Sequence, residues 1–222
     1  MRVAGLLLAL VLVTSCFVGG TFAKYVTSGT GSDSARVAKF GVTVTANGST
    51  FAETYKTDDT SATAIANSVV SSETGKNVVA PGTRGNMVSM ALSGTPEVAV
   101  EVEYEATVEV KDWTVNNEFY CPIEIKVGED TIKGLDYDSV DAFQNAVKEK
   151  IDGYTAKYAP GTDLSQTATV KTPTVSWSWA FEGTGEGAKQ TDVKDTALGD
   201  QAANGTAATI KLEVKTTVTQ ID

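Results

Sequence analysis

Strict alternation of apolar and polar residues is the strongest pattern in the chain. From Val98 to Val110 every second residue is apolar, and most of the residues between them are glutamates. A period of two with β-branched residues on one side is typical of an antiparallel strand with one buried and one wet face. Because this run is longer than most strands, we expect a bend or bulge in it. Its row of glutamates should discourage stray edge pairing.

The same alternation predicts strands over 38–46, 118–127, 174–182 and 209–221. Pro122 in the second of these indicates an edge or a bulge, since proline cannot donate to a sheet. In the last segment Lys211 and Lys215 lie on the outer face. We expect them to face the glutamate row across a strand pair.

The segment 174–182 places several aromatic side chains on one face: Val175, Trp177, Trp179 and Phe181. Such a stripe could serve as a carbohydrate platform, but within an alternating strand it more often belongs to the core. We interpret it as core. Cys121, in an apolar strand and without a histidine partner, is interpreted in the same way as a small buried side chain.

Helical spacing occurs once between the strands. Apolar residues recur every three or four positions at Val140, Phe143, Val147 and Ile151. Asp138 or Ser139 is the expected N-cap and Gly153 the expected residue after the last turn. A second, shorter helix is expected within 191–205, and a short helix or strand within the polar segment 47–80.

Together these segments predict the fold class. It is mainly β, a two-sheet antiparallel jelly-roll-like sandwich with one inserted amphipathic helix at about 138–152. A single domain over 37–222 is long enough to bury a sizeable core.

The chain opens on an apolar block that follows Arg2 and runs to Val18. The block is shorter than the roughly 20 residues that a spanning helix needs. It ends in two glycines and a small-x-small exit at Thr21 and Ala23, which is typical of a secretory signal. We therefore predict that residues 1–23 are removed by a signal peptidase, with the cut next to Lys24, and that no stable membrane insertion remains.

A rival interpretation concerns Cys16. The residues "VTSC" have the shape of a bacterial lipobox, in which the cysteine is acylated and becomes the first residue. Both readings of this segment predict export, to the extracellular matrix or to the cell surface.

The amino-acid composition argues against several classes of function. The chain has 18 Lys and Arg against 28 Asp and Glu, a net charge of −10, which argues against nucleic acid and anionic membranes as partners. It contains no histidine, so HExxH zinc sites and Ser-His-Asp triads are excluded. We predict no catalytic residues and no cofactor. Acidic runs at 128–141 and 186–200 leave calcium open, although neither matches an EF-hand loop.

Three motifs resemble the TasA/camelysin family, the matrix-fibre proteins of Gram-positive biofilms that a SipW-type signal peptidase processes. The first is "GGTFAKY", Gly19 to Tyr25, followed by a polar run and a strand near Phe40. The second is "VAPGTRGNMVSMALSGTPEVAVEVEYEATV" at 79–108, with Thr83 where the family often has an acid. The third is the closing "WSWAFE…KDTALGD…TVTQID".

This resemblance implies a secreted fibre subunit that assembles with itself or with related subunits. Because the chain has no histidine, we predict no enzyme activity. The resemblance also implies donor-strand complementation, in which residues 24–36 of one subunit pair with an open sheet edge in the next. The candidate donor residues are Tyr25, Val26, Thr27 and Ser28. Added-strand recognition draws affinity from main-chain hydrogen bonds and specificity from alternate side-chain pockets.

Other interpretations stay open at this point. Residues 24–36 could be a loose tail, as chain ends often are. Some relatives in the family are classed as metallo-endopeptidases, an activity for which a chain without histidine is poorly equipped. A monomeric surface adhesin or ligand-binding module on the same sandwich is the third alternative.

Overall fold

The computed structural model describes residues 38–47, 51–56, 66–181 and 188–222. Val37–Asp222 forms one compact unit, and the description below concerns the described residues of that unit. The predicted fold class is confirmed, because the chain is mainly β with antiparallel sheets and an inserted amphipathic helix.

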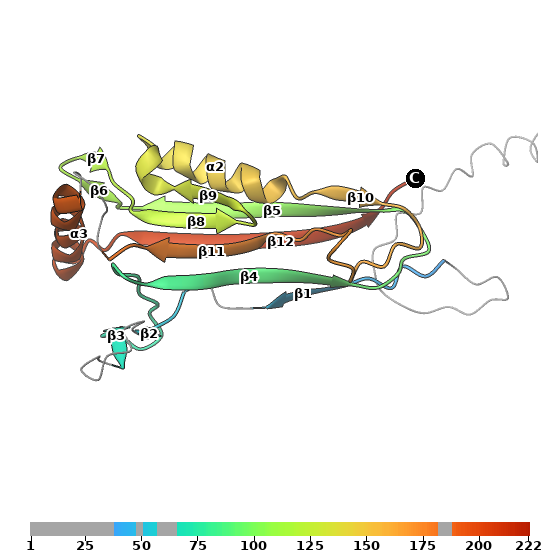
Figure 1. Cartoon of the computed structure of the whole chain (residues 1–222), viewed down its shortest axis with the longest axis horizontal. Helices are drawn as coiled ribbons and strands as arrows, with labels where there is room; N and C mark the ends of the chain where they lie inside the picture. Colours follow the sequence, from blue (N-terminus) through green and yellow to red (C-terminus); the bar gives the residue numbers. More distant parts are fainter. Residues whose placement is uncertain (1–37, 48–50, 57–65, 182–187) are drawn as a thin grey trace, which may run out of the picture. The chain divides into compact units, whose positions relative to one another are not determined.

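Two sheets form the sandwich (Figure 1). The larger has five strands, in the order β1 (Thr43–Asn47), β4 (Arg84–Ser93), β11 (Thr174–Trp179), β8 (Ile123–Val127) and β9 (Asp130–Lys133). The smaller has three, in the order β10 (Ala156–Tyr158), β5 (Val100–Lys111) and β12 (Thr209–Gln220).

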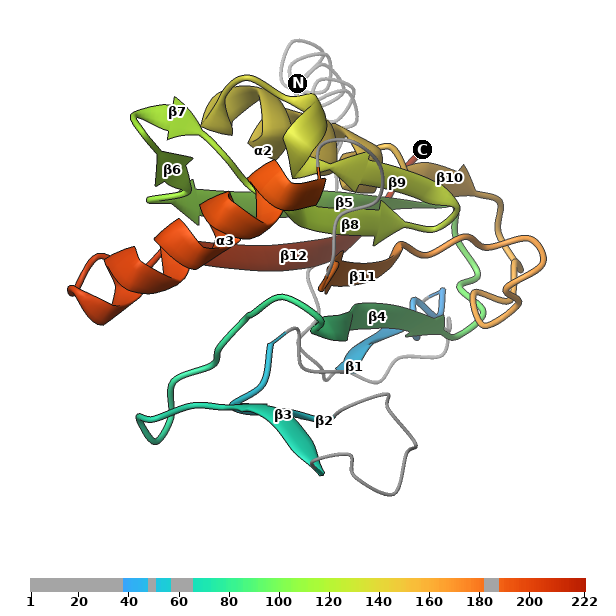
Figure 2. The ribbon, with the colours of Figure 1, turned by 60° about the vertical axis from the view of Figure 1, so that its left-hand side comes forward.

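Two hairpins and three helical segments complete the unit. The hairpins are β2 (Thr54–Lys56) with β3 (Asn67–Val70), and β6 (Thr114–Val115) with β7 (Glu118–Phe119). The helical segments are η1 (Gly134–Asp136), α2 (Val140–Asp152) and α3 (Ala188–Ala203). Figure 2 shows α3 at the same end of the strands as the β6–β7 hairpin.

The alternating pattern of β5 becomes alternating burial. Its apolar side chains from Val100 to Val110 are at most 7% exposed, while the glutamates between them face outward. All of β12 pairs with β5 in one continuous antiparallel register, from Thr209↔Lys111 to Gln220↔Val100. The expected bulge is therefore wrong. Continuous pairing over the full length is enough to hold this long strand regular.

The aromatic stripe is core, as predicted, with one exception. Val175, Trp177 and Trp179 are buried, and Trp179 packs on Trp113 with ring centroids 5.5 Å apart. Phe181 was expected on the same face, but it is 70% exposed. The reason is that β11 ends at Trp179, so the period of two no longer directs the side chain inward.

The inserted helix begins and packs as its sequence predicts. Ser139 is the N-cap and accepts a hydrogen bond from the Ala142 N–H. Phe143, Val147 and Ile151 are fully buried. Gly153 is the C-cap of this helix, with a φ of −62° in the right-handed region. A left-handed conformation, which often requires glycine at a helix end, does not occur at this position.

The remaining predicted segments are confirmed with shifted bounds. Strand 118–127 is interrupted around Pro122, between β7 and β8, and the polar segment 47–80 supplies the β2–β3 hairpin. The second helix, α3, ends shortly before Gly205, whose φ is +91°. With 16 residues it is longer than the 13-residue α2, whereas a shorter helix was expected. The first strand starts only at Thr43, because Gly41 before it has a left-handed φ of +46°.

Candidate functional site

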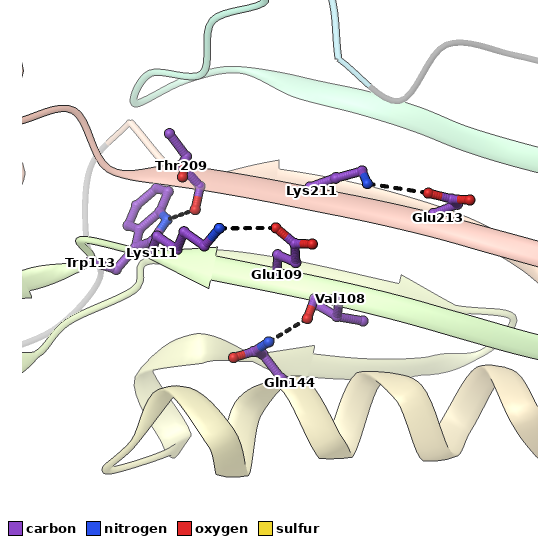
Figure 3. Close-up of polar contacts among 8 residues, drawn as sticks. All are labelled: Val108, Glu109, Lys111, Trp113, Gln144, Thr209, Lys211 and Glu213. Carbon is purple, nitrogen blue, oxygen red and sulfur yellow. Dashed lines mark hydrogen bonds and ion pairs between the residues drawn. The ribbon is translucent and has the colours of Figure 1, made fainter.

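One edge of the smaller sheet is closed by side chains of α2 and of Thr155, which follows α2. Beyond the short β10, the free edge of β5 has no strand beside it among the described residues. Thr155 Oγ1 instead accepts from the Tyr104 N–H at 3.2 Å, and Asp152 Oδ1 accepts from the Ala106 N–H at 2.9 Å. Gln144 donates to the Val108 carbonyl (Figure 3). These side chains satisfy backbone groups that an edge strand would otherwise expose.

The opposite side of the smaller sheet ends in β12, which has a strand partner on one side only within the described chain. The Ile221 N–H donates to the Ala99 carbonyl, and the Thr209 carbonyl accepts from the Trp113 indole. Odd-numbered residues therefore point their backbone groups toward β5. Since successive residues of a strand point to opposite edges, the even-numbered residues from Ile210 to Gln220 direct N–H and C=O groups outward.

This edge is long compared with the other outermost strands. β12 has 12 residues, whereas β1 has 5 and β9 has 4. Among the described residues no strand pairs with this side of β12, and a row of backbone groups of this length is a template for pairing with another strand. The β12 edge is therefore the candidate functional site.

The inner face of β12 is less covered than that of its neighbour. Ile210, Leu212 and Val214 are half-buried, although their partners on β5, Val110, Val108 and Ala106, are buried. Figures 1 and 2 show the cause. β12 lies over β11, while β4 and β1 extend the larger sheet beyond it. The smaller sheet has no strand opposite β4 and β1 among the described residues.

The outer face of β5 and β12 carries exposed charge pairs, as predicted. Lys211 lies opposite Glu109 and Lys215 opposite Glu105. Lys215 Nζ is 3.8 Å from Glu105, whereas Lys211 Nζ turns to Glu213 on its own strand at 3.2 Å (Figure 3). Exposed pairs of this kind are each worth at most about 1 kcal/mol. They make the outer face of β12 polar.

A hollow of about 800 Å³ lies at the start of β12. Its lining includes Trp113, Trp179, Leu198, Ile210 and Leu212, together with residues 71–73 and 76–81. Phe51, which lines this hollow, and Tyr55 of β2 pack against Trp177 with ring centroids 5.3 and 5.6 Å away.

Asp195 fixes α3 over this end of the sandwich. It accepts hydrogen bonds from the Tyr120 hydroxyl at 2.6 Å and from the Trp179 indole at 3.1 Å. Burial raises the pKa of the Asp195 carboxyl, and these two hydrogen bonds lower it again only in part. Burial and the nearby carboxylate also raise the pKa of the Tyr120 hydroxyl.

The predicted site residues divide into two groups. The cleavage residues Thr21, Ala23 and Lys24 and the donor residues Tyr25, Val26, Thr27 and Ser28 lie outside the described residues, as does Cys16. Cys121 is described and is fully buried, and burial raises the pKa of its thiol to about 12. That environment keeps the thiol protonated and inert.

The described residues contain neither a cluster of metal ligands nor a membrane-spanning helix. Across these residues, no three Cys, Asp or Glu side chains converge on a point where they could share a metal ion. In the same part of the chain, the helices lack the length and apolarity to cross a bilayer. The sequence patterns did not predict the contacts of the α2 side chains with β5 or those of Asp195, because a single polar side chain that bonds a distant part of the chain leaves no periodic signal.

The comparisons with known proteins give no relative. No protein-family model, no curated protein and no solved structure matches this chain.

Proposed function

We propose that this chain is a secreted structural protein that forms or decorates extracellular matrix fibres, and that it assembles by strand addition. The observation that carries the proposal is the 12-residue edge of β12, which directs its even-numbered backbone groups away from its only described strand partner. Strand addition at such an edge gains a ladder of main-chain hydrogen bonds.

The asymmetry of the sandwich supports the same function. A protein that avoids association covers or shortens its sheet edges, and α2 does so for β5. The β12 edge has no comparable side-chain caps in the described part of the chain. Residues 24–36, which precede the compact unit, are the proposed donor, with Tyr25 and Val26 as apolar anchors.

The two alternative functions have less support. A metal-dependent peptidase would need a ligand cluster, and the described residues supply none. An adhesin with an aromatic platform would need exposed tryptophans, yet Trp177 and Trp179 are 3% and 6% exposed.

Electron microscopy of two purified chains tests the proposal. Residues 24–222 should form filaments, and residues 37–222 should remain as single particles, because the second chain keeps the acceptor edge but lacks the donor. Circular dichroism of both chains provides the folding control. A further control replaces Tyr25 and Val26 by serine, which should reduce filament formation without changing the fold. Single particles of the longer chain under all conditions, or filaments of equal number from both chains, would overturn the proposal.

A further inference from the structure

We propose that the hollow at the start of β12 binds a small organic cation, an ammonium group on an apolar body, and that the Asp195 carboxylate receives the ammonium. The site goes beyond the proposed function. Filaments can form without it, and it can bind its ligand without filaments.

The hollow has the size and the lining of a small-molecule site. Its volume of about 800 Å³ lies within the roughly 300–1,000 Å³ that such sites occupy. Ile210 and Leu212 of β12, together with Val79 and Pro81, supply apolar surface, and all four are half-buried. This part of the hollow can therefore accommodate an apolar body.

One face of α3, which lies at the end of the sandwich where β12 begins (Figure 2), forms a second wall. Asp195, Leu198, Gly199 and Ala202 line the hollow, and their spacing of three and four residues places them on one side of the helix. Glycine weakens a helix interior relative to alanine, yet among the described residues a Cβ at Gly199 would lie in open space. Packing within the subunit does not require this glycine, and its lack of a side chain leaves room in the hollow.

Asp195 gives this wall a negative charge. Its two oxygens accept from the Tyr120 hydroxyl and the Trp179 indole, but a carboxylate has about four acceptor sites. Among the described residues, the one charged group that shifts the pKa of Asp195 is the Asp192 carboxylate, which raises it. The Lys194 ammonium lies instead over the Tyr120 ring. An ammonium in the hollow would bond the remaining acceptor sites and offset the charge.

The other charged groups that line the hollow do not replace such a cation. Lys211 pairs with Glu213 at 3.2 Å on the outer face of β12. Lys76 and Glu73 are both exposed and have opposite charges, so together they add no net charge. A ligand with an ammonium group and an apolar body matches both Asp195 and the apolar wall, whereas an anion would be repelled by the carboxylate.

Two probes of nearly equal shape test the proposal. Phenethylamine carries the ammonium, and phenethyl alcohol has a hydroxyl in its place. Tryptophan fluorescence of the 24–222 chain at neutral pH, after removal of filaments by centrifugation, follows binding because Trp113 and Trp179 line the hollow. The amine should bind saturably with a Kd of about 1 mM or tighter. The alcohol should bind about tenfold more weakly, because it lacks the charge-assisted hydrogen bond.

Substitutions on α3 locate the site. Asp195→Asn should weaken amine binding about tenfold and leave alcohol binding unchanged, whereas a merely structural role would affect both probes alike. Asp200→Asn, which removes an exposed carboxylate from the same helix, is its control. Gly199→Leu should abolish the binding of both probes by filling the hollow, and it should raise the thermal stability because leucine favours a helix. Thr196→Leu adds the same side chain at an exposed position and should not change binding.

Three results would overturn the proposal. They are no saturable binding of the amine by the wild-type chain, equal affinities of that chain for amine and alcohol, and unchanged amine binding by Gly199→Leu. Each of them can be obtained even if Asp195→Asn does not fold. None of them bears on filament formation, which electron microscopy tests separately.

Discussion

The Tyr120 hydroxyl donates a 2.6 Å hydrogen bond to Asp195 across 75 residues of sequence. Tyr120 follows β7, and Asp195 lies in the middle of α3, so this contact joins the helix to the sandwich. Lys194 adds to it, with its ammonium 5.1 Å from the centre of the Tyr120 ring.

Asp195→Ala should therefore destabilise the fold. It leaves the Trp179 indole without its acceptor and the Tyr120 hydroxyl with only the Thr191 carbonyl at 3.2 Å. A buried donor without a partner costs about 1–3 kcal/mol. Chemical denaturation followed by tryptophan fluorescence measures the loss. Asp192→Ala removes an exposed carboxylate from the same helix and should change the free energy of unfolding by less than about 0.5 kcal/mol. Equal effects of the two substitutions would contradict the role of Asp195.

The raised pKa of Asp195 predicts a pH dependence with a definite sign. Because the folded pKa lies above the ordinary value of 3.8, the folded state binds the proton more tightly than the unfolded state. The stabilisation from this group is complete below the unfolded pKa and is lost as the pH rises through the folded pKa. The unfolding free energy of the wild type minus that of Asp195→Asn should decrease over this interval. A difference that is constant or increases with pH would contradict the prediction.

Gly94→Ala should destabilise the contact between the end of β4 and the start of β1. A Cβ at Gly94 would lie 2.1 Å from the Gly41 carbonyl oxygen, and its φ is +114°. Gly75→Ala is the control, because Gly75 also has a positive φ, +77°, but nothing within 4 Å of its Cβ position. Thermal unfolding should show Gly94→Ala to be less stable than Gly75→Ala by about 1–3 kcal/mol, as expected for an overpacked site.

Asp152→Ala should expose part of the β5 edge. The Ala106 N–H loses its acceptor, which should cost about 1–2 kcal/mol, while Asp152→Asn keeps an acceptor oxygen and should lose less. Hydrogen exchange at Ala106 is the direct measurement, and it should accelerate in the alanine variant. Glu149→Ala, an exposed position on the same helix, should leave that exchange rate unchanged.

The sequence alone predicts most of the sandwich, because its main elements have strong periodic patterns. The strict alternation of β5 predicts its buried face, and the lysines of 209–221 predict the pairing of β12 with the glutamate row. The spacing from Val140 to Ile151 predicts α2 and the side that it buries. In each case the spacing of the apolar residues determines both the type of element and the face that it buries.

The features that shape the candidate site have no such pattern. Phe181 continues the alternating run of β11 but follows the end of that strand. The alternation therefore predicts a buried side chain, although Phe181 is exposed. The contacts of Asp152 with Ala106 and of Asp195 with Tyr120 join distant parts of the chain, and each involves a single polar side chain. The greater width of the larger sheet, which leaves β4 and β1 extending beyond β12, depends on strand order. Strand order is set by tertiary packing rather than by any one segment.

If subunits assemble by strand addition as proposed, the cover that α2 provides over β5 would limit how they can branch. A three-stranded sheet with both long edges open could accept two strands, and each subunit could then become a junction in a network. Gln144, Asp152 and Thr155 bond the backbone groups along the outer edge of β5. Among the described residues, that leaves the smaller sheet one long edge, β12, that could accept a strand. Under the proposed strand addition, subunits that join through that sheet would form a linear thread.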